Sequence, residues 1–274
     1  MYKIGLSSFG FDLTEENFQK MAQSGIEAVE VSLHWSRYGE INYQELSDFS
    51  KRYHIDLWSL HLPFSSRNNI DISSEDPSVR AKTVALHKEL IEKAAAIGIQ
   101  KFILHPSGEP ITDARRGDRM KNSMENLDIL AEFAHKHQAV IAVEDLPRTC
   151  LGNTAEEMLQ LLSANDKLRV CLDSNHLLTD TNRNFIEKLG DKIVTLHISD
   201  YDFTDEKHWL PGEGLVDWQE IYSMLQKAGY QGVWMYELGL TAPATHPRSR
   251  DLTFADFVRN AKEIFANKPL SKII

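Results

Sequence analysis

Six side chains that commonly bind metal ions stand at or beside the last residue of a short apolar run. They are His61, His105, Glu144, Asp173, His197 and Glu237. The runs that carry them are LWSLHL (57–62), KFILH (101–105), VIAVED (140–145), RVCLD (169–173), KIVTLH (192–197) and VWMYEL (233–238). Each run has the length and the apolar content of a buried β-strand. Side chains that end parallel strands at the same edge face one mouth, so the pattern predicts a single site.

Four of these residues end four successive strands, and they are Glu144, Asp173, His197 and Glu237. Three carboxylates in one pocket would repel one another at neutral pH unless a cation neutralised them. The sequence therefore predicts one divalent metal ion. An oxygen-rich donor set with one imidazole suits Mn²⁺ first, with Zn²⁺, Co²⁺ or Mg²⁺ as alternatives. Strand capping alone would explain any one of these residues, but it does not explain four on adjacent strands.

Further imidazoles surround the predicted metal site, and they are His61, His105, His176 and His208. His176 lies three residues after Asp173 in LDSNH, and His208 lies in HWLPGEG. One interpretation is that these side chains hydrogen-bond the carboxylates or a substrate hydroxyl, and the other is that they bind two further metal ions. The sequence favours the first, so we assign them to substrate binding. Trp209, beside His208, is predicted to stack on the substrate, and packing within the loop is the alternative.

Strand-like runs alternate with amphipathic helical stretches along the whole chain. Two more strands are predicted at KIGLSS (3–8) and AVEVSLHW (28–35). Helices are predicted from Thr14 to Gly25, over 42–54, 77–98 and 118–137, from Thr154, and over 182–190, 217–229 and 252–266. Eight strand and helix pairs with gaps suited to right-handed crossovers predict an α/β fold, a (β/α)8 TIM barrel. A doubly wound open sheet is the alternative, but no G-x-G-x-x-G follows the first strand.

Length and composition narrow the class of protein. Barrels of this type commonly reach about 250 residues as one unit, so residues 1–274 are predicted to form a single domain. The net charge of −10 argues against a nucleic acid partner held by a broad basic face. Cys150 and Cys171 are too few for a disulfide framework. Because neither a signal peptide nor a membrane span is apparent, a cytoplasmic protein without a membrane partner is predicted.

The sequence resembles the sugar phosphate isomerase/epimerase superfamily, the xylose isomerase-like TIM barrels. The resemblance runs through LHLPF, LHPSG, VEDLP, LDSNH and LHISD, and it is most specific in HWLPGEGLVDWQEIYSMLQKAGYQGVWMYEL. It implies metal ligands at Glu144, Asp173, His197 and Glu237. It also implies that Glu144 and Glu237 are the catalytic acid/base pair and that His176 contacts substrate oxygens. The implied activity is that of an isomerase or epimerase, in which a glutamate removes the proton α to a carbonyl and a metal-stabilised enediolate forms.

Two positions depart from the ketose 3-epimerases that this chain resembles. Cys150 stands where they carry an acidic residue, and Phe203 stands where they carry an arginine. The expected substrate is therefore a small polyhydroxy carbonyl compound, with sugars, sugar acids, phosphosugars and inositol-derived ketones all open. Arg148 in EDLPR is predicted to hold an anionic group of the substrate, and an ordinary exposed loop charge is the alternative. The oligomeric state also stays open, since family members often form dimers or tetramers.

The same barrel also serves other classes of protein. Endonuclease IV, a metal-dependent phosphodiesterase that cleaves DNA at abasic sites, has a ligand pattern that can be followed onto this chain, with Glu206 where it carries an aspartate. Binding of duplex DNA requires clustered basic side chains, and the mixed or acidic rim loops here offer one basic cluster, Arg115, Arg116 and Arg119, which a solvated helix edge also explains. The sequence therefore favours a small substrate. A related dehydratase, and a barrel that binds a sugar or a metal without turnover, are the remaining alternatives.

Overall fold

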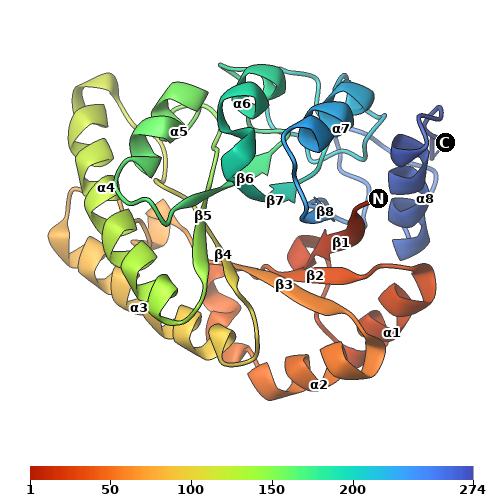
Figure 1. Cartoon of the computed structure of the whole chain (residues 1–274), viewed down its shortest axis with the longest axis horizontal. Coiled ribbons are helices and arrows are strands. Elements are labelled where there is room, and N and C mark those ends of the chain that lie inside the picture. The colour runs from red at the N-terminus through yellow and green to blue at the C-terminus, as the bar shows by residue number, and fades with distance from the viewer. Residues whose placement is uncertain (274) are drawn as a thin grey trace.

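The structure, a computed structural model, describes residues 1–273 as a parallel eight-stranded sheet surrounded by helices (Figure 1). The strands are β1 (Lys3–Ser7), β2 (Ala28–Val31), β3 (Asp56–His61), β4 (Lys101–Leu104), β5 (Val140–Glu144), β6 (Arg169–Asp173), β7 (Ile193–His197) and β8 (Val233–Tyr236). Each strand lies beside its neighbour in sequence, and β1 also pairs with β8. A parallel bridge between Ile198 and Tyr236 closes the barrel between β7 and β8. The predicted TIM barrel is confirmed.

The α-helices lie outside the barrel and alternate with the strands (Figure 1). They are α1 (Glu15–Ser24), α2 (Tyr43–Tyr53), α3 (Pro77–Ala95), α4 (Asp113–Lys136), α5 (Ala155–Leu162), α6 (Asn182–Leu189), α7 (Trp218–Lys227) and α8 (Phe254–Phe265). Several begin where a side-chain oxygen caps the first turn, as Thr14 does for α1 and Asp76 for α3. Gly25 ends α1 in the left-handed conformation, with φ of 92°. These signals explain why the alternation of elements could be predicted.

The predicted boundaries differ most from the structure at two elements, β2 and α4. β2 ends at Val31 rather than at Trp35. The Ser8 hydroxyl donates to the Ser32 carbonyl and accepts from the Ser32 N–H, and these hydrogen bonds take the place of backbone pairing where the segments after β1 and β2 leave the sheet. Helix α4 begins at Asp113 rather than at residue 118. Gly117, a residue that usually weakens a helix, lies inside its first turns. Both differences shift residues between the rim and the regular elements, and neither moves the end of a strand that carries a predicted metal ligand.

The inside of the barrel is filled by side chains below its mouth. Two apolar clusters lie there: Ala28, Val233 and Met235 with Trp58, and Ile103, Ala142 and Cys171 with Val194. Gly5 on β1 makes room for the first cluster, since a Cβ atom at this position would lie 2.6 Å from Val233 Cγ1. A packed interior of this kind supports the strands rigidly up to their carboxyl ends.

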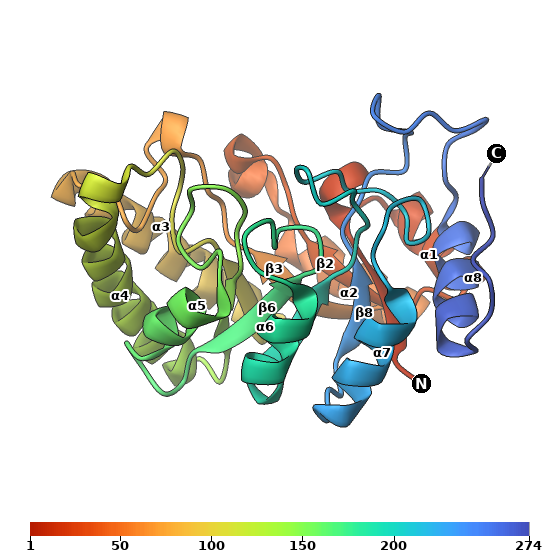
Figure 2. The same ribbon diagram turned by 90° about the horizontal axis from the view of Figure 1, so that it is seen from above.

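The loops that follow the carboxyl ends of the strands gather on one side of the barrel. Figure 2 shows these loops at the top of the view, where the blue segment between β8 and α8 extends far above the helices. The helices lie lower, around the strands. Residues that end the strands therefore face the region that the loops surround. Among residues 1–273, no helix combines the length and the apolar character needed to cross a bilayer.

Candidate metal centre and acid/base site

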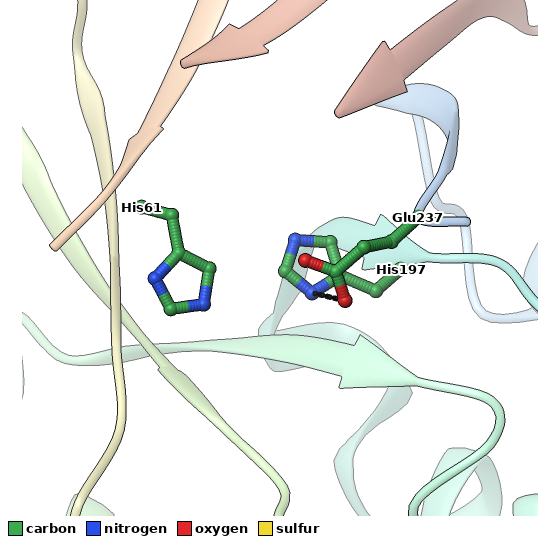
Figure 3. A group of neighbouring side chains, drawn as sticks. All are labelled: His61, His197 and Glu237. Carbon is green, nitrogen blue, oxygen red and sulfur yellow. Dashed lines mark ion pairs between the residues drawn. The ribbon is translucent and has the colours of Figure 1, made fainter. Parts of the chain in front are cut away.

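Glu144, Asp173, His197 and Glu237 meet at the mouth of the barrel. Ligand atoms of the four side chains lie within 4.8 Å of one another, and all four residues are buried. His197 Nδ1 lies 2.8 Å from Glu144 Oε1 and 3.3 Å from Glu237 Oε2. Figure 3 shows His197 and Glu237 pointing toward one another, with His61 facing them. The structure thus brings together the four residues that the sequence predicts as metal ligands.

The donor atoms fit a divalent cation. Asp173 Oδ2 is buried and has no hydrogen-bond partner among residues 1–273, and a carboxylate oxygen in that state is costly unless a positive charge compensates it. Glu144 and Glu237 add two more buried carboxylates at the same point. An ion with two positive charges would satisfy the Asp173 oxygen and offset the repulsion among the three acids. Oxygen donors with a single imidazole suit Mn²⁺, Co²⁺, Mg²⁺ or Zn²⁺.

The two glutamates have pKa values that are shifted in opposite directions. Burial raises the pKa of Glu237 to about 7, and the neighbouring carboxylates of Glu144 and Asp173 add to the rise, while His197 opposes it. Burial also acts to raise the pKa of Glu144, but His197 and His105 outweigh burial and hold that pKa well below its usual value. Two carboxyl groups whose environments separate their pKa values are suited to act as base and acid.

The four additional histidines surround this centre in two groups. His61 and His105 each direct Nε2 at Glu144 Oε2, at 3.1 and 3.0 Å. On the other side, His176 Nε2 lies 3.2 Å from Glu206 Oε2 and 3.5 Å from Asp173 Oδ2. A further set of close potential metal ligands consists of His176, Glu206 and His208. The structure therefore places every predicted histidine near the centre.

One residue of the centre, Glu30 on β2, was missed by the sequence analysis. Glu30 is fully buried, and its Oε1 lies 2.9 Å from His197 Nε2. Its Oε2 accepts a hydrogen bond of 2.7 Å from the Ser59 hydroxyl. The available signal is an acidic residue inside the apolar run AVEV, because a glutamate is almost never fully buried unless it is paired. The thiol of Cys171 is also within reach of Glu144 and His197.

Arg148 joins three loops at the rim. Its guanidinium lies 2.5 Å from Glu109 in the loop after β4, and 2.8 and 3.0 Å from Asp205 and Glu206 in the loop after β7. Side-chain hydrogen bonds to Glu109 are the main cause of a raised Arg148 pKa. These acids already neutralise the arginine charge. A contact between Arg148 and an anionic substrate group stays a prediction, and it would have to compete with them.

Aromatic residues line the rim in two different ways. Trp209 is buried, and its indole N–H donates to Thr245 Oγ1 at 3.0 Å, which ties the loop after β7 to the loop after β8. Its contact with a substrate stays a prediction. Phe64 is 48% exposed and stacks on the His105 ring with 3.6 Å between ring centres. Phe203, in the loop after β7, is 51% exposed.

Comparison with known proteins places the chain in a family. A family model described as xylose isomerase-like TIM barrel matches residues 18–254. D-psicose 3-epimerase of Enterocloster bolteae is 26% identical over 204 residues, which are 70% of this chain and 65%, less than two thirds, of that protein. Inosose isomerase of Halalkalibacterium halodurans is 23% identical over 232 residues, which are 80% of this chain and 77% of that protein.

A crystal structure of a D-tagatose 3-epimerase-like protein matches the fold. It superposes with a TM-score of 0.82 at 24% identity, over 97% of both chains. The strand ends of this chain thus belong to a barrel architecture that has been solved in another protein. With the family model covering most of the chain, the conclusion follows that this protein belongs to the xylose isomerase-like TIM barrel family.

Proposed function

We propose that the protein is a metal-dependent isomerase or epimerase of a small polyhydroxy carbonyl compound. The observation that carries this proposal is the pair of buried glutamates, Glu144 and Glu237, with opposite pKa shifts beside the unpartnered oxygen of Asp173. Relatives named D-psicose 3-epimerase and inosose isomerase support the class of reaction. We include free sugars, sugar acids and inositol-derived ketones in the substrate class.

The chemistry follows from the two glutamates. A divalent ion held by Glu144, Asp173, His197 and Glu237 would polarise the substrate carbonyl. Glu144, whose pKa is low, is deprotonated at neutral pH and can accept the proton from the carbon α to that carbonyl. The substrate would become an enediolate, and Glu237 can return a proton that it takes up from solvent on a carboxylate oxygen not held by the ion, while Glu144 releases its proton to solvent. Return to the opposite face of the same carbon gives an epimer, and return to the adjacent carbon gives an isomer.

The histidines supply orientation in this proposal. His61 and His105 contact the same oxygen of Glu144, so they leave Glu144 Oε1 on the side of His197 and the proposed ion. His176 contacts both Asp173 and Glu206, and it is our candidate for a hydrogen bond to substrate oxygens. Fixing a base and its substrate in a reactive geometry removes much of the entropic barrier to proton transfer.

Exchange of the substrate's α-hydrogen tests the proposal directly. The purified protein with Mn²⁺ would be incubated in D₂O with ketohexoses, sugar acids and inososes, and ¹H NMR would follow the signal of the α-hydrogen. We expect that signal to disappear for at least one compound, and EDTA treatment should stop the loss. A metal-loaded protein that exchanges no α-hydrogen in any of these classes would contradict the proposal. The same spectra would reveal a dehydratase, because elimination of water gives a different product.

A phosphodiesterase is a second candidate, because the groups of potential metal ligands extend to His176, Glu206 and His208. The basic side chains argue against it. Arg115, Arg116 and Arg119 lie on α4 and pair with Glu75, Glu157 and Asp71, at 3.1, 2.5 and 2.5 Å. These ion pairs reduce the positive charge available for phosphates. Elemental analysis separates the candidates: we expect a single equivalent of divalent metal, and three equivalents would favour the phosphodiesterase.

A further inference from the structure

The two ring nitrogens of His197 face different surroundings. Nδ1 lies 2.8 Å from Glu144 Oε1 and faces the other acids of the centre, at 3.3 Å from Glu237 and 4.0 Å from Asp173. Nε2 lies 2.9 Å from Glu30 Oε1, away from the mouth. A neutral imidazole carries a proton on only one nitrogen, and the partner of that nitrogen decides which electron pair is free. The contact with Glu30 therefore bears on which nitrogen can bind a metal ion.

Other histidines at the mouth are held differently. His61 and His176 hydrogen-bond the backbone carbonyls of Leu62 and Asp145 through Nδ1, at 3.0 and 2.9 Å. His208 Nδ1 likewise faces the carbonyl of Glu237 at 3.0 Å. Compared with these three, His197 is distinguished by a carboxylate as the partner of the nitrogen that faces away from the metal centre. A carboxylate is the stronger acceptor, so it holds the ring more firmly and makes the opposite nitrogen a more basic ligand.

Glu30 reaches His197 across the barrel interior. The two residues are 167 positions apart, and β2 and β7 are not neighbours in the sheet. Glu30 is itself held by the Ser59 hydroxyl on β3. A fully buried carboxylate is strongly destabilising unless paired, and the partners of Glu30 are His197 and Ser59. The geometry is thus a chain of hydrogen bonds from β3 through β2 to the centre.

We infer that Glu30 is a positioning residue for the metal centre: it accepts the Nε2–H of His197 and leaves the electron pair of Nδ1 directed at an ion held by Glu144, Asp173 and Glu237. The inference rests on the metal ion of the proposed function, but not on the reaction or on the substrate. It assigns a role to a residue that itself contacts neither the ion nor the substrate. Loss of such an orienting partner typically weakens metal binding by about 10- to 100-fold.

The test is the affinity for Mn²⁺ of the full-length chain without substrate, measured by isothermal titration calorimetry. Glu30→Leu removes the acceptor and should weaken binding by about 100-fold, whereas Glu30→Gln keeps a weaker, neutral acceptor and should weaken it by about 10-fold. The matched control is Thr195→Val, which removes another buried hydrogen bond of the interior, the one that Thr195 accepts from Trp58 at 3.1 Å. We expect parental affinity for this control.

The protonation of His197 gives an independent readout. In the Zn²⁺-loaded protein, ¹⁵N NMR of the imidazole, assigned with a His197→Asn variant, should show the proton on Nε2. A proton on Nδ1 would overturn the inference, and so would parental Mn²⁺ affinity in a folded Glu30→Leu protein. If Glu30→Leu does not fold, parental affinity of Glu30→Gln overturns it instead. A parent protein that binds no divalent ion would defeat the metal centre itself, which is a distinguishable result.

Discussion

Two layers of the barrel interior lie two residues apart on four of the strands, and on these strands one layer is apolar and the other can carry charge. The lower layer includes Ile103, Ala142, Cys171 and Met235, which pack in apolar clusters. The upper layer, two residues further along each strand, is His105, Glu144, Asp173 and Glu237. Side chains two positions apart project from the same face of a strand. Apolar packing in the lower layer therefore stabilises the fold, while titratable side chains are concentrated in the upper layer.

The upper layer destabilises the folded state when no metal ion is bound. Asp173 Oδ2 is buried and has no hydrogen-bond partner within the described residues 1–273, and burial and neighbouring carboxylates raise the pKa of Glu237 to about 7. Both features mean that the folded state without metal holds negative charge in an unfavourable place. The apolar layer below, in which Met235 is fully buried, stabilises the folded state instead. Substitutions in the two layers should therefore separate stability from function.

The largest effect should come from the acid/base pair of the upper layer. Glu144→Gln removes the proposed base while keeping the side-chain shape, so exchange of the substrate's α-hydrogen with D₂O should fall by about 10²- to 10⁴-fold. Glu237→Gln removes the proposed proton donor, so formation of the product should fall by a similar factor. The measurement is ¹H NMR at saturating Mn²⁺, with circular dichroism to establish that the fold is intact. Full exchange in Glu144→Gln, or full product formation in Glu237→Gln, would refute the assignment of that glutamate.

A substitution in the lower layer should have the complementary effect. Met235→Ala leaves a cavity in a packed cluster and should lower the free energy of unfolding by about 2–5 kcal/mol, with Mn²⁺ affinity unchanged. Asp173→Asn in the upper layer should abolish tight Mn²⁺ binding, yet it should leave the metal-free protein as stable as the parent or more so. Urea unfolding in EDTA measures the stability of both variants, and isothermal titration calorimetry measures their Mn²⁺ affinity. Equal destabilisation by the two substitutions would show that the layers are not separable in this way.

Much of the fold could be predicted because local signals and the global topology agree. Each apolar run has the length of a strand, and cap residues such as Thr14 and Asp76 start the helices where predicted. The end of β2 could not be predicted, because it depends on hydrogen bonds between Ser8 and Ser32, which are distant in sequence. Periodicity within a segment carries no information about such a contact.

The site was predictable to the extent that its residues end strands. A residue at the carboxyl end of a barrel strand lies close to the mouth, so the position of Asp173 or His197 in the sequence already indicates where it lies. Glu30 lies inside a strand, and its role depends on a partner 167 residues away. The ion pairs of Arg148 with Glu109 and Asp205 depend on the paths of two loops, which hydrophobic periodicity does not specify. The rim was therefore the least predictable region.

The smallest of these effects should be the pH dependence of metal stabilisation. The pKa of Glu237 is about 7 in the folded protein without metal, against 4.5 for an ordinary glutamate. Between these values the folded state keeps a proton that the unfolded state has released, so the stability of the metal-free protein falls as pH rises through this window. A metal ion takes the place of that proton, and its binding therefore strengthens as pH rises.

Removal of the metal should consequently lower the melting temperature more at about pH 8 than at about pH 5.5. At a free Mn²⁺ concentration 100 times the Kd, the ion should stabilise the fold by about 2.7 kcal/mol. Calorimetric scans with Mn²⁺ and with EDTA at both pH values give the comparison. Glu237→Gln is the matched variant, because it removes the titrating group, and its metal-free stability should lose the part of the pH dependence that Glu237 causes. A metal-dependent difference that is the same at both pH values, or larger at the acidic one, would mean that the charge of the upper layer is balanced by other groups.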